Sequence, residues 1–283
     1  MSKNTITSKK FAKIIKLTSQ IIFFTIVLLT SIVHGLSEIG KTINISLIKN
    51  ASLHSICPFG GVVSVYKYFT EGSFVQKIHQ SSFVLLILVL ILSLLFGTVF
   101  CGFICPFGSI QEWIGKIGKK IFKTKYNRFV PLKFDKYLRY VRYAVLAWVI
   151  YITAKTGLLI FVNIDPYHAL FTFWTGEVAI QAIIALILTL ISSLFVERPF
   201  CKYFCPFGAF LGLFNFIRIF KIKRNKSTCI SCKACDNKCP MNIKVSEATI
   251  VSDPRCITCL ECTSEITCPV NNTINLEAIG GKK

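Results

Sequence analysis

Eight cysteines lie close together near the end of the sequence, in two groups of four. The first group stands in CISCKACDNKCP, residues 229–240, and the second in CITCLECTSEITCP, residues 256–269. Each group has three cysteines at two-residue intervals and a fourth directly before a proline. Three closely spaced thiolates on one loop can wrap three irons of a cubane, while the fourth ligand must arrive from elsewhere. The spacing therefore predicts two iron–sulfur sites.

The two runs resemble the ligand runs of bacterial dicluster ferredoxins, in which the fourth cysteine ligates the other cluster. The resemblance implies one [4Fe-4S] cluster on Cys229, Cys232, Cys235 and Cys268, and a second on Cys256, Cys259, Cys262 and Cys239. The second run has five residues rather than three before its last cysteine. We therefore expect the loop near Thr263 to Thr267 to bulge.

Zinc and disulfides are the two alternatives for these thiols. A zinc ribbon usually shows two separated pairs of ligands, and two triplets that each end in Cys-Pro fit that pattern poorly. Disulfides are disfavoured because the topology argued below keeps the thiols in the reducing cytoplasm. About fifty residues is also too short a segment to fold by burial alone, so metal binding and folding are expected to be one event.

The composition predicts a membrane protein with a small soluble end. The chain has 283 residues, of which 53% are hydrophobic and 16% charged, and its mean hydropathy is +0.60. Apolar runs long enough to cross a bilayer occur at residues 17–33, 83–100, 141–162 and 178–195. We expect a mainly α fold: a four-helix integral membrane bundle of two duplicated helix pairs over residues 1–225, and a small α+β dicluster ferredoxin domain over residues 226–277.

Lysines and arginines set the expected orientation. Residues 1–16 carry five of them, residues 101–140 nine and residues 196–228 seven, while residues 163–177 carry none. The positive-inside rule then places both termini in the cytoplasm of a multi-pass protein of the cytoplasmic membrane. An uncleaved first span is favoured over a secretory signal, because residues 33–35 make a poor cleavage site. The net charge of +20 is better explained by topology and anionic membrane lipid than by nucleic acid, which we exclude as a partner.

A Cys-Pro-Phe-Gly motif recurs along the membrane part. FCGFICPFG at residues 100–108 and FCKYFCPFG at residues 200–208 are copies offset by one hundred residues, which indicates a duplicated unit. Because residues four apart share a helix face, each span is expected to end at its motif with both thiols on one side. The pairs Cys101 and Cys105, and Cys201 and Cys205, are predicted to meet in a further redox or metal site, with buried structural cysteines as the alternative. Cys57, in the third copy, is predicted to be structural or half of a site.

Taken together, these features resemble the NapH/NosR/MauN family of membrane polyferredoxins. The resemblance implies electron transfer between cytoplasmic [4Fe-4S] clusters and either the quinone pool or a flavin-bearing membrane or extracytoplasmic partner, with a cytoplasmic electron donor or acceptor. The protein would then be an electron-transfer subunit of a membrane oxidoreductase, similar to a quinol dehydrogenase, rather than a free-standing enzyme. The alternative is a FixG/CcoG-like reductase of a metal such as copper, or a metal-centre assembly factor, although those proteins usually carry a further domain.

Overall fold

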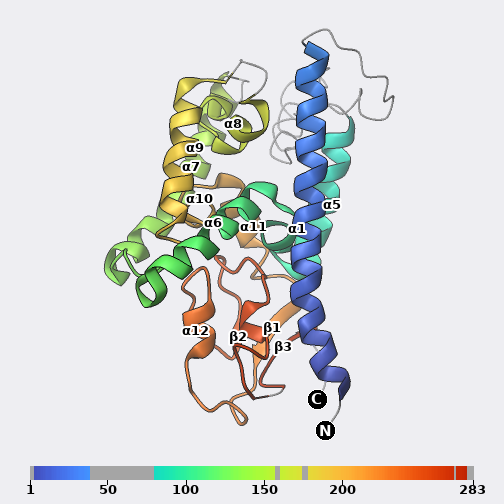
Figure 1. The fold of residues 1–283 in the computed structure, drawn as a ribbon, viewed down its shortest axis with the longest axis vertical. Helices are drawn as coiled ribbons and strands as arrows, with labels where there is room; N and C mark the ends of the chain where they lie inside the picture. Colours follow the sequence, from blue (N-terminus) through green and yellow to red (C-terminus); the bar gives the residue numbers. More distant parts are fainter. Residues whose placement is uncertain (1–2, 39–79, 157–159, 174–177, 271, 279–283) are drawn as a thin grey trace. The chain divides into compact units, whose positions relative to one another are not determined.

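The chain is mainly helical with one small sheet, as the computed structural model in Figure 1 shows; the structure describes residues 3–38, 80–156, 160–173, 178–270 and 272–278. The longer helices are α1 (Lys3–Glu38), α5 (Gln80–Phe96), α6 (Pro106–Phe122), α7 (Leu132–Thr156) and α9 (Ile180–Ser193). The shorter ones are α8 (Pro166–Thr172), α10 (Pro199–Tyr203), α11 (Pro206–Leu213) and α12 (Ala234–Lys238). Single turns form the π-helix η1 (Phe100–Ile104) and the 3₁₀ helices η2 (Lys123–Lys125), η3 (Ile160–Asn163) and η5 (Glu261–Thr263).

The described chain divides into two compact units. Unit 1 contains residues 1–21, 91–105 and 208–283, and unit 2 contains residues 22–90 and 106–207. Unit 1 therefore joins the cysteine-rich segment to the amino-terminal part of α1 and to the end of α5. This partition differs from a boundary drawn at residue 225 in the sequence, and that boundary stays a prediction.

One helical stretch among the described residues, Ile14–Val33 in α1, is both long and apolar enough to cross a membrane. The stretches Val84–Phe96 and Ile180–Ser193 are apolar but shorter. Helices cover most of the four apolar runs singled out in the sequence, and the four-helix membrane bundle itself stays a prediction. The outer segment with Cys57 lies outside the described residues.

The two Cys-Pro-Phe-Gly copies share one backbone pattern. We expected each apolar helix to end at its motif, but α5 ends at Phe96 and α9 at Ser193, and a separate short helix carries the first cysteine of each pair. A left-handed residue precedes each short helix: Gly97 at φ +78° and Arg198 at φ +50°. Such a residue interrupts the run of helical hydrogen bonds. The second cysteine then donates its N–H to the phenylalanine carbonyl five residues earlier, at 2.9 Å in both copies.

The sheet in unit 1 is antiparallel with strand order β2-β1-β3. Its strands are β1 (Phe220–Arg224), β2 (Ile250–Val251) and β3 (Ile274–Ala278). Ile222 in the central strand faces Val251 and Leu276. The Ile219 N–H donates to the Leu94 carbonyl at 3.0 Å, and the Phe96 and Phe220 rings stack with centroids 4.9 Å apart. The sheet is thus fixed to the last turn of α5.

Small residues let α6 approach its neighbours closely in unit 2. A β-carbon on Gly118 would overlap the Leu194 carbonyl after α9, and one on Gly115 would overlap the Tyr126 hydroxyl. The Tyr126 hydroxyl also donates to the Ser193 carbonyl at 3.3 Å. The end of α9 is therefore held against α6 by backbone contacts that leave no room for a side chain.

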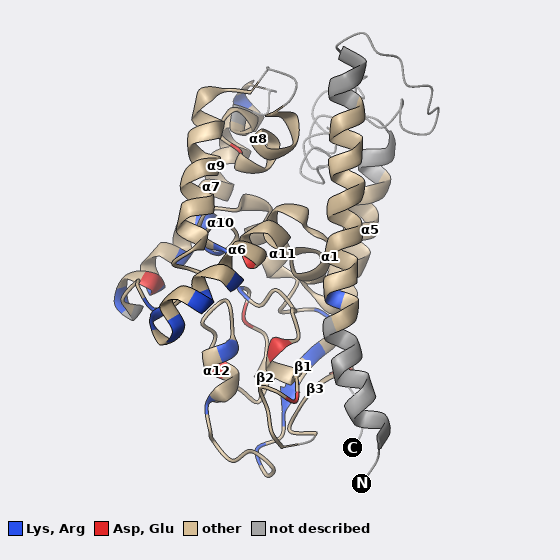
Figure 2. Cartoon of the chain, viewed as in Figure 1, with Lys and Arg blue, Asp and Glu red and all other residues tan. Residues whose placement is uncertain are grey.

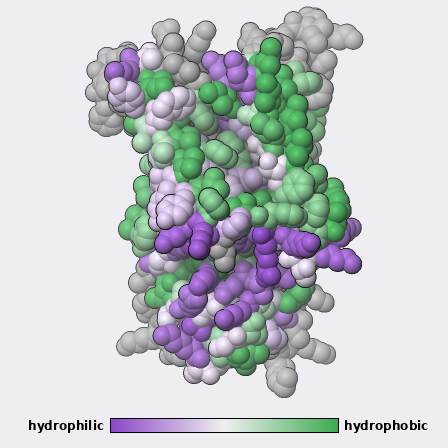
Figure 3. Space-filling view, turned by 90° about the vertical axis from the view of Figure 1, so that its left-hand side faces the viewer, coloured by the Kyte–Doolittle hydropathy of each residue, from purple (hydrophilic) through white to green (hydrophobic). Residues whose placement is uncertain are grey.

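Charge and hydropathy are segregated on the surface of unit 2. Figure 2 shows lysines and arginines gathered at the turn between α6 and α7. Hydrophobic residues cover much of the upper part of the face in Figure 3, where helices of this unit lie. On α9 the exposed large hydrophobic side chains are all aliphatic: Ile180, Ile184, Ile187, Leu188 and Ile191. An apolar surface of this kind marks contact with lipid or another protein.

Replacing Gly118 by alanine should destabilise unit 2. Overpacking of a filled site costs roughly 1–3 kcal/mol, because the neighbouring backbone must shift. We expect a lower thermal unfolding midpoint for Gly118→Ala in detergent, monitored by helical circular dichroism. Lys120→Ala on the same helix is the control, because Lys120 is exposed. Equal midpoints for the two variants would contradict the close packing of α6 described above.

Candidate iron–sulfur site

The two C-x-x-C-x-x-C loops have the same backbone conformation. Ser231 and Lys233 in the first loop adopt positive φ angles, and so do Thr258 and Leu260 at the matching positions of the second. Non-glycine residues in the left-handed region are costly and persist only where the surroundings hold them. Both loops are therefore wound in the same way around their thiols.

The first pocket of unit 1 is lined by Cys229, Cys232, Cys235 and Cys268, with apolar residues around them. About 330 Å³ of space, solvent at the mouth included, is free of protein atoms here. Cys232 is exposed and Cys235 is buried. The residues between Cys262 and Cys268 close this side: Cys268 N–H donates to the Ser264 carbonyl at 2.8 Å, and the Ser264 and Thr267 hydroxyls bond at 2.9 Å.

The second pocket of unit 1 is lined by Cys239, Cys256, Cys259 and Cys262. Its free space is about 360 Å³, again with solvent at the mouth, and its polar lining is nearly absent because Ile222, Met241, Ile243 and Val251 complete the wall. We name the two sets of thiols site 1 and site 2. In each site, three cysteines come from one run and the fourth from the other run.

Burial raises the pKa of four of these eight thiols. It raises the pKa of Cys235 to about 11 and the pKa of Cys259 to about 11, and it raises the pKa of Cys239 and Cys262 as well. Neighbouring thiols raise the pKa of Cys262 further. Of the thiols whose pKa is shifted, only the partly exposed Cys229 has a lowered pKa, through the Ser231 N–H and the Arg224 side chain. A positive centre that binds here must displace protons from the thiols.

The arrangement of the thiols fits a multi-iron cluster better than a single ion. Tetrahedral zinc holds its sulfur ligands at about 2.3 Å, which brings them close together. In the part of the chain that the structure describes, no three His, Cys, Asp or Glu side chains converge tightly enough for one ion. Two sets of four thiols around open pockets match the ligand number of [4Fe-4S] clusters, and the assignment of these residues as ligands stays a prediction.

Backbone and side-chain contacts within unit 1 hold the site 2 loop in place. The Cys256 carbonyl accepts hydrogen bonds from the Thr98 hydroxyl and from the Asn215 amide, the latter at 2.8 Å. Asn215 is fully buried and also donates to the Asp253 carbonyl at 3.1 Å. A β-carbon on Gly102 would lie 2.5 Å from the Ile257 carbonyl. The turn after α5 is therefore shaped to receive this loop.

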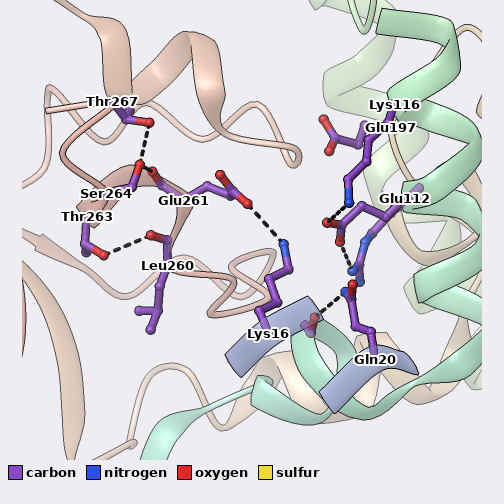
Figure 4. Close-up of polar contacts among 12 residues, drawn as sticks. Lys16, Gln20, Glu112, Lys116, Glu197, Leu260, Glu261, Thr263, Ser264 and Thr267 are labelled. Carbon is purple, nitrogen blue, oxygen red and sulfur yellow. Dashed lines mark hydrogen bonds and ion pairs between the residues drawn. The ribbon is translucent and has the colours of Figure 1, made fainter. Parts of the chain in front are cut away.

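The amino-terminal helix contributes to the same region of unit 1. In Figure 4 the Lys16 ammonium points at the Glu261 carboxylate, 3.2 Å away, and Lys16 is buried. One turn later Gln20 donates to the Gly102 carbonyl at 3.2 Å. The Lys16 charge also acts to lower the pKa of Cys259, against the larger effect of burial. Sequence reasoning assigned Lys16 only to membrane topology.

Arg218 is a second residue whose role the sequence did not reveal. Its side chain is fully buried in unit 1, and its guanidinium lies 4.0 Å from the Cys256 sulfur. In the surrounding apolar stretch, residues 210–220, α11 ends at Leu213 and turns follow. The only available signal was the presence of a single charge in an otherwise apolar run.

The cysteines of the repeated motif are divided between the units. Cys101 and Cys105 lie in unit 1 and Cys201 and Cys205 in unit 2, all partly exposed. The Gln111 amide lies 3.6 Å from the Cys201 sulfur and its oxygen accepts the Phe200 N–H. A shared site of all four thiols stays a prediction.

A buried ion pair lies next to the second copy in unit 2. Arg198, the left-handed residue before α10, pairs with Glu112 at 2.5 Å. Figure 4 shows Glu112 beside Lys116 and Glu197. Lys202, between the two cysteines, pairs with the buried Asp135 at 3.1 Å, and the Tyr203 hydroxyl donates to the same carboxylate at 2.6 Å. The cations of this motif are thus paired inside the protein, so their role extends beyond the positive-inside signal.

Comparison with known proteins connects the repeat to iron–sulfur chemistry. A family described as "4Fe-4S binding domain" matches residues 78–125 and 178–227. Each match contains one Cys-Pro-Phe-Gly copy, and both end before Cys229. The matches support the duplication expected from the sequence.

Three relatives extend the likeness to most of the chain. The uncharacterized protein MJ0750 of Methanocaldococcus jannaschii is 35% identical over 74% of this chain and 82% of its own length. The putative electron transport protein YccM of Escherichia coli is 30% identical over 77% of this chain and 61% of its own length. The ferredoxin-type protein NapH of Haemophilus influenzae is 25% identical over 62% of each chain.

The chain belongs to the NapH/NosR-type polyferredoxin family. Of these relatives, YccM is named as a putative electron transport protein and NapH as a ferredoxin-type protein. The chain spans less than two thirds of the length of both these relatives. No solved structure matches it.

Replacing Asn215 by alanine should loosen the site 2 loop. The Cys256 and Asp253 carbonyls each lose one of their two donors, and a lost buried hydrogen bond costs about 0.5–1.5 kcal/mol. We expect bound iron to be lost to a chelator several-fold faster from Asn215→Ala than from the parent, followed by the decay of visible absorption. Asn275→Ala is the matched control, because the Asn275 amide bonds only to the exposed Asn272 carbonyl nearby. Equal rates in both variants would contradict the anchoring role.

Proposed function

We propose that this protein is a membrane-bound electron carrier with two [4Fe-4S] clusters, one at site 1 and one at site 2. The observation that carries the proposal is the pair of pockets, each lined by four thiols drawn from both cysteine runs. When bound, each cluster supplies a centre that accepts or releases one electron. Two such centres match the two electrons that a quinol releases together with two protons.

The protein's own residues exclude water from one site more than from the other. Site 2 has an apolar wall and buried Cys256 and Cys262, while site 1 includes the exposed Cys232. Site 1 is therefore suited to exchange with a soluble cytoplasmic partner. Site 2 is suited to exchange within the membrane part, with the quinone pool or a flavin-bearing subunit.

Cluster content is the first test. The parent protein should contain about eight iron and eight acid-labile sulfide per chain, four of each for every four-thiolate cubane. Cys259→Ser should lower iron to about half, because it removes a site 2 ligand. Ser252→Ala, a mild change in the same segment, is the control for handling losses. Zinc without sulfide in the parent would contradict the proposal.

We propose a multi-pass membrane topology with both termini in the cytoplasm. It is supported by the apolar stretch Ile14–Val33, the exposed aliphatic side chains of α9 and the basic turn between α6 and α7. Membrane lipid covers the apolar surfaces in this arrangement, and anionic headgroups attract the basic turn.

Reporter fusions test this topology. Fusions after Lys125 and Lys283 should report the cytoplasmic side, and fusions after Glu71 and Phe173 the outer side. A reporter that is active only when exported and one that is active only in the cytoplasm should give opposite results at each point. An outer-side result at Lys283 would place the thiols outside the reducing compartment and contradict the proposal.

Electron exchange with a membrane donor tests the relay. Protein purified without oxygen from its native membrane is mixed with a menaquinol analogue and, separately, with reduced ferredoxin, while the cluster spectrum is recorded. Bleaching by at least one donor is expected, and Cys259→Ser should bleach to a smaller extent. No response to either donor, together with prompt reduction of a bound copper ion by chemically reduced protein, would favour the metal-reductase alternative.

A further inference from the structure

Arg218 is a fully buried cation in unit 1, on the turns that follow α11. Its Nη1 donates to the Thr258 hydroxyl at 2.8 Å and to the Phe96 carbonyl at 3.3 Å, and its Nη2 donates to the Val251 carbonyl at 2.7 Å. Nη2 also lies 4.0 Å from the Cys256 sulfur. The Nε–H has no acceptor in the described part of the chain. The guanidinium therefore faces site 2 from the protein interior.

No carboxylate balances this charge among the residues that the structure describes. The buried arginine of unit 2, Arg198, pairs with Glu112, and Lys16 pairs with Glu261, whereas every described partner of Arg218 is a neutral oxygen or a cysteine sulfur. A buried charge without a counter-charge is strongly unfavourable. The negative charge that would balance it is that of the site 2 thiolates.

A backbone clamp alone does not explain an arginine at this position. Thr258 already bonds the Phe96 carbonyl through its own hydroxyl at 3.0 Å, and Asn215 holds the Cys256 carbonyl. The space is also shaped around the side chain, since a β-carbon on Gly97 would lie 2.8 Å from the Arg218 Cδ. What the guanidinium adds to these contacts is a permanent positive charge, because arginine stays protonated in proteins.

We propose that Arg218 is the counter-cation of the site 2 cluster and raises the reduction potential of that cluster. This inference rests on the two-cluster function proposed above. Four thiolates and a cubane core carry net negative charge, and reduction adds one more electron. A cation next to a ligand sulfur stabilises the reduced form more than the oxidised form, and the dry surroundings of site 2 leave little solvent to screen it.

Site 1 has an arginine with a weaker expected effect. Arg224 is itself largely buried, but it acts on the partly exposed Cys229 of a site that also includes the exposed Cys232, and its Nε–H donates to the Ala248 carbonyl at 3.0 Å. Water screens its charge more effectively than that of Arg218. The electron should therefore rest preferentially on site 2, the cluster held by the turn after α5.

The test compares Arg218→Gln, Arg218→Lys and the parent in anaerobic redox titrations followed by electron paramagnetic resonance, with iron content measured on each sample. Each cluster gives one reduction wave in the titration, and the wave that Arg224→Gln changes is identified as that of site 1. Arg255→Gln is the matched control, because Arg255 adjoins Cys256 in sequence but pairs with Asp253 and is partly exposed. We expect Arg218→Gln to lower the midpoint potential of one wave by at least about 59 mV, which for one electron is a tenfold change in the reduction equilibrium.

Arg218→Lys should keep the potential of the shifted wave close to that of the parent, because lysine retains the positive charge although it lacks the planar guanidinium. Arg255→Gln should leave both waves in place. Unchanged waves in an iron-replete Arg218→Gln protein would overturn the inference. Loss of iron from Arg218→Gln but not from Arg218→Lys would support it, whereas equal iron loss from both would show that only the hydrogen bonds matter. A parent protein with a single wave or no iron would instead refute the two-cluster function.

Discussion

The repulsion among eight thiolates in one short segment is the constraint on which unit 1 depends. Burial, and the charge of neighbouring thiols, raise the pKa of Cys239, Cys259 and Cys262. In the proposed function, iron would supply the positive charge that permits the thiols to ionise, so folding of this segment and cluster binding would be coupled.

The remainder of unit 1 keeps the site 2 loop next to the turn after α5. Thr98, Asn215 and Gln20 bond backbone carbonyls there, and Gly102 permits the close approach of the loop. Lys16 and Arg218 add positive charge around the same cysteines. The amino-terminal part of α1 therefore has a second role besides any contact with lipid: together with the turns after α5 and α11, it supplies polar groups that hold the site 2 loop and its surroundings.

Local spacing explains what the sequence could predict. The two C-x-x-C-x-x-C runs and the hundred-residue offset of the repeated motif are patterns within short stretches, and they led to the family and to iron–sulfur chemistry. The helix breaks were missed because they depend on tertiary context: Arg198 is not a residue that favours positive φ, yet its pairing with Glu112 holds it there. Asn215 and Arg218 were missed because their partners lie more than thirty residues away in sequence.

The two copies of the motif also show how one duplicated backbone pattern acquires two environments. Both copies place a short helix between a left-handed residue and a Cys-Pro step. The first copy contacts the site 2 loop through Gly102, and the second copy carries the buried ion pairs of Arg198 and Lys202. Duplication thus accounts for the shared fold of the copies but not for the side chains that each one uses.

The central claim is that two cubane clusters lie close together in one small segment, and the spin state of the fully reduced protein tests it most directly. Two neighbouring reduced [4Fe-4S] clusters should give an electron paramagnetic resonance spectrum that integrates to about two spins per chain, broadened by their magnetic interaction. Cys259→Ser should convert it to a sharper signal of about one spin. A single sharp signal from the parent, or no signal from an iron-free protein, would contradict the account.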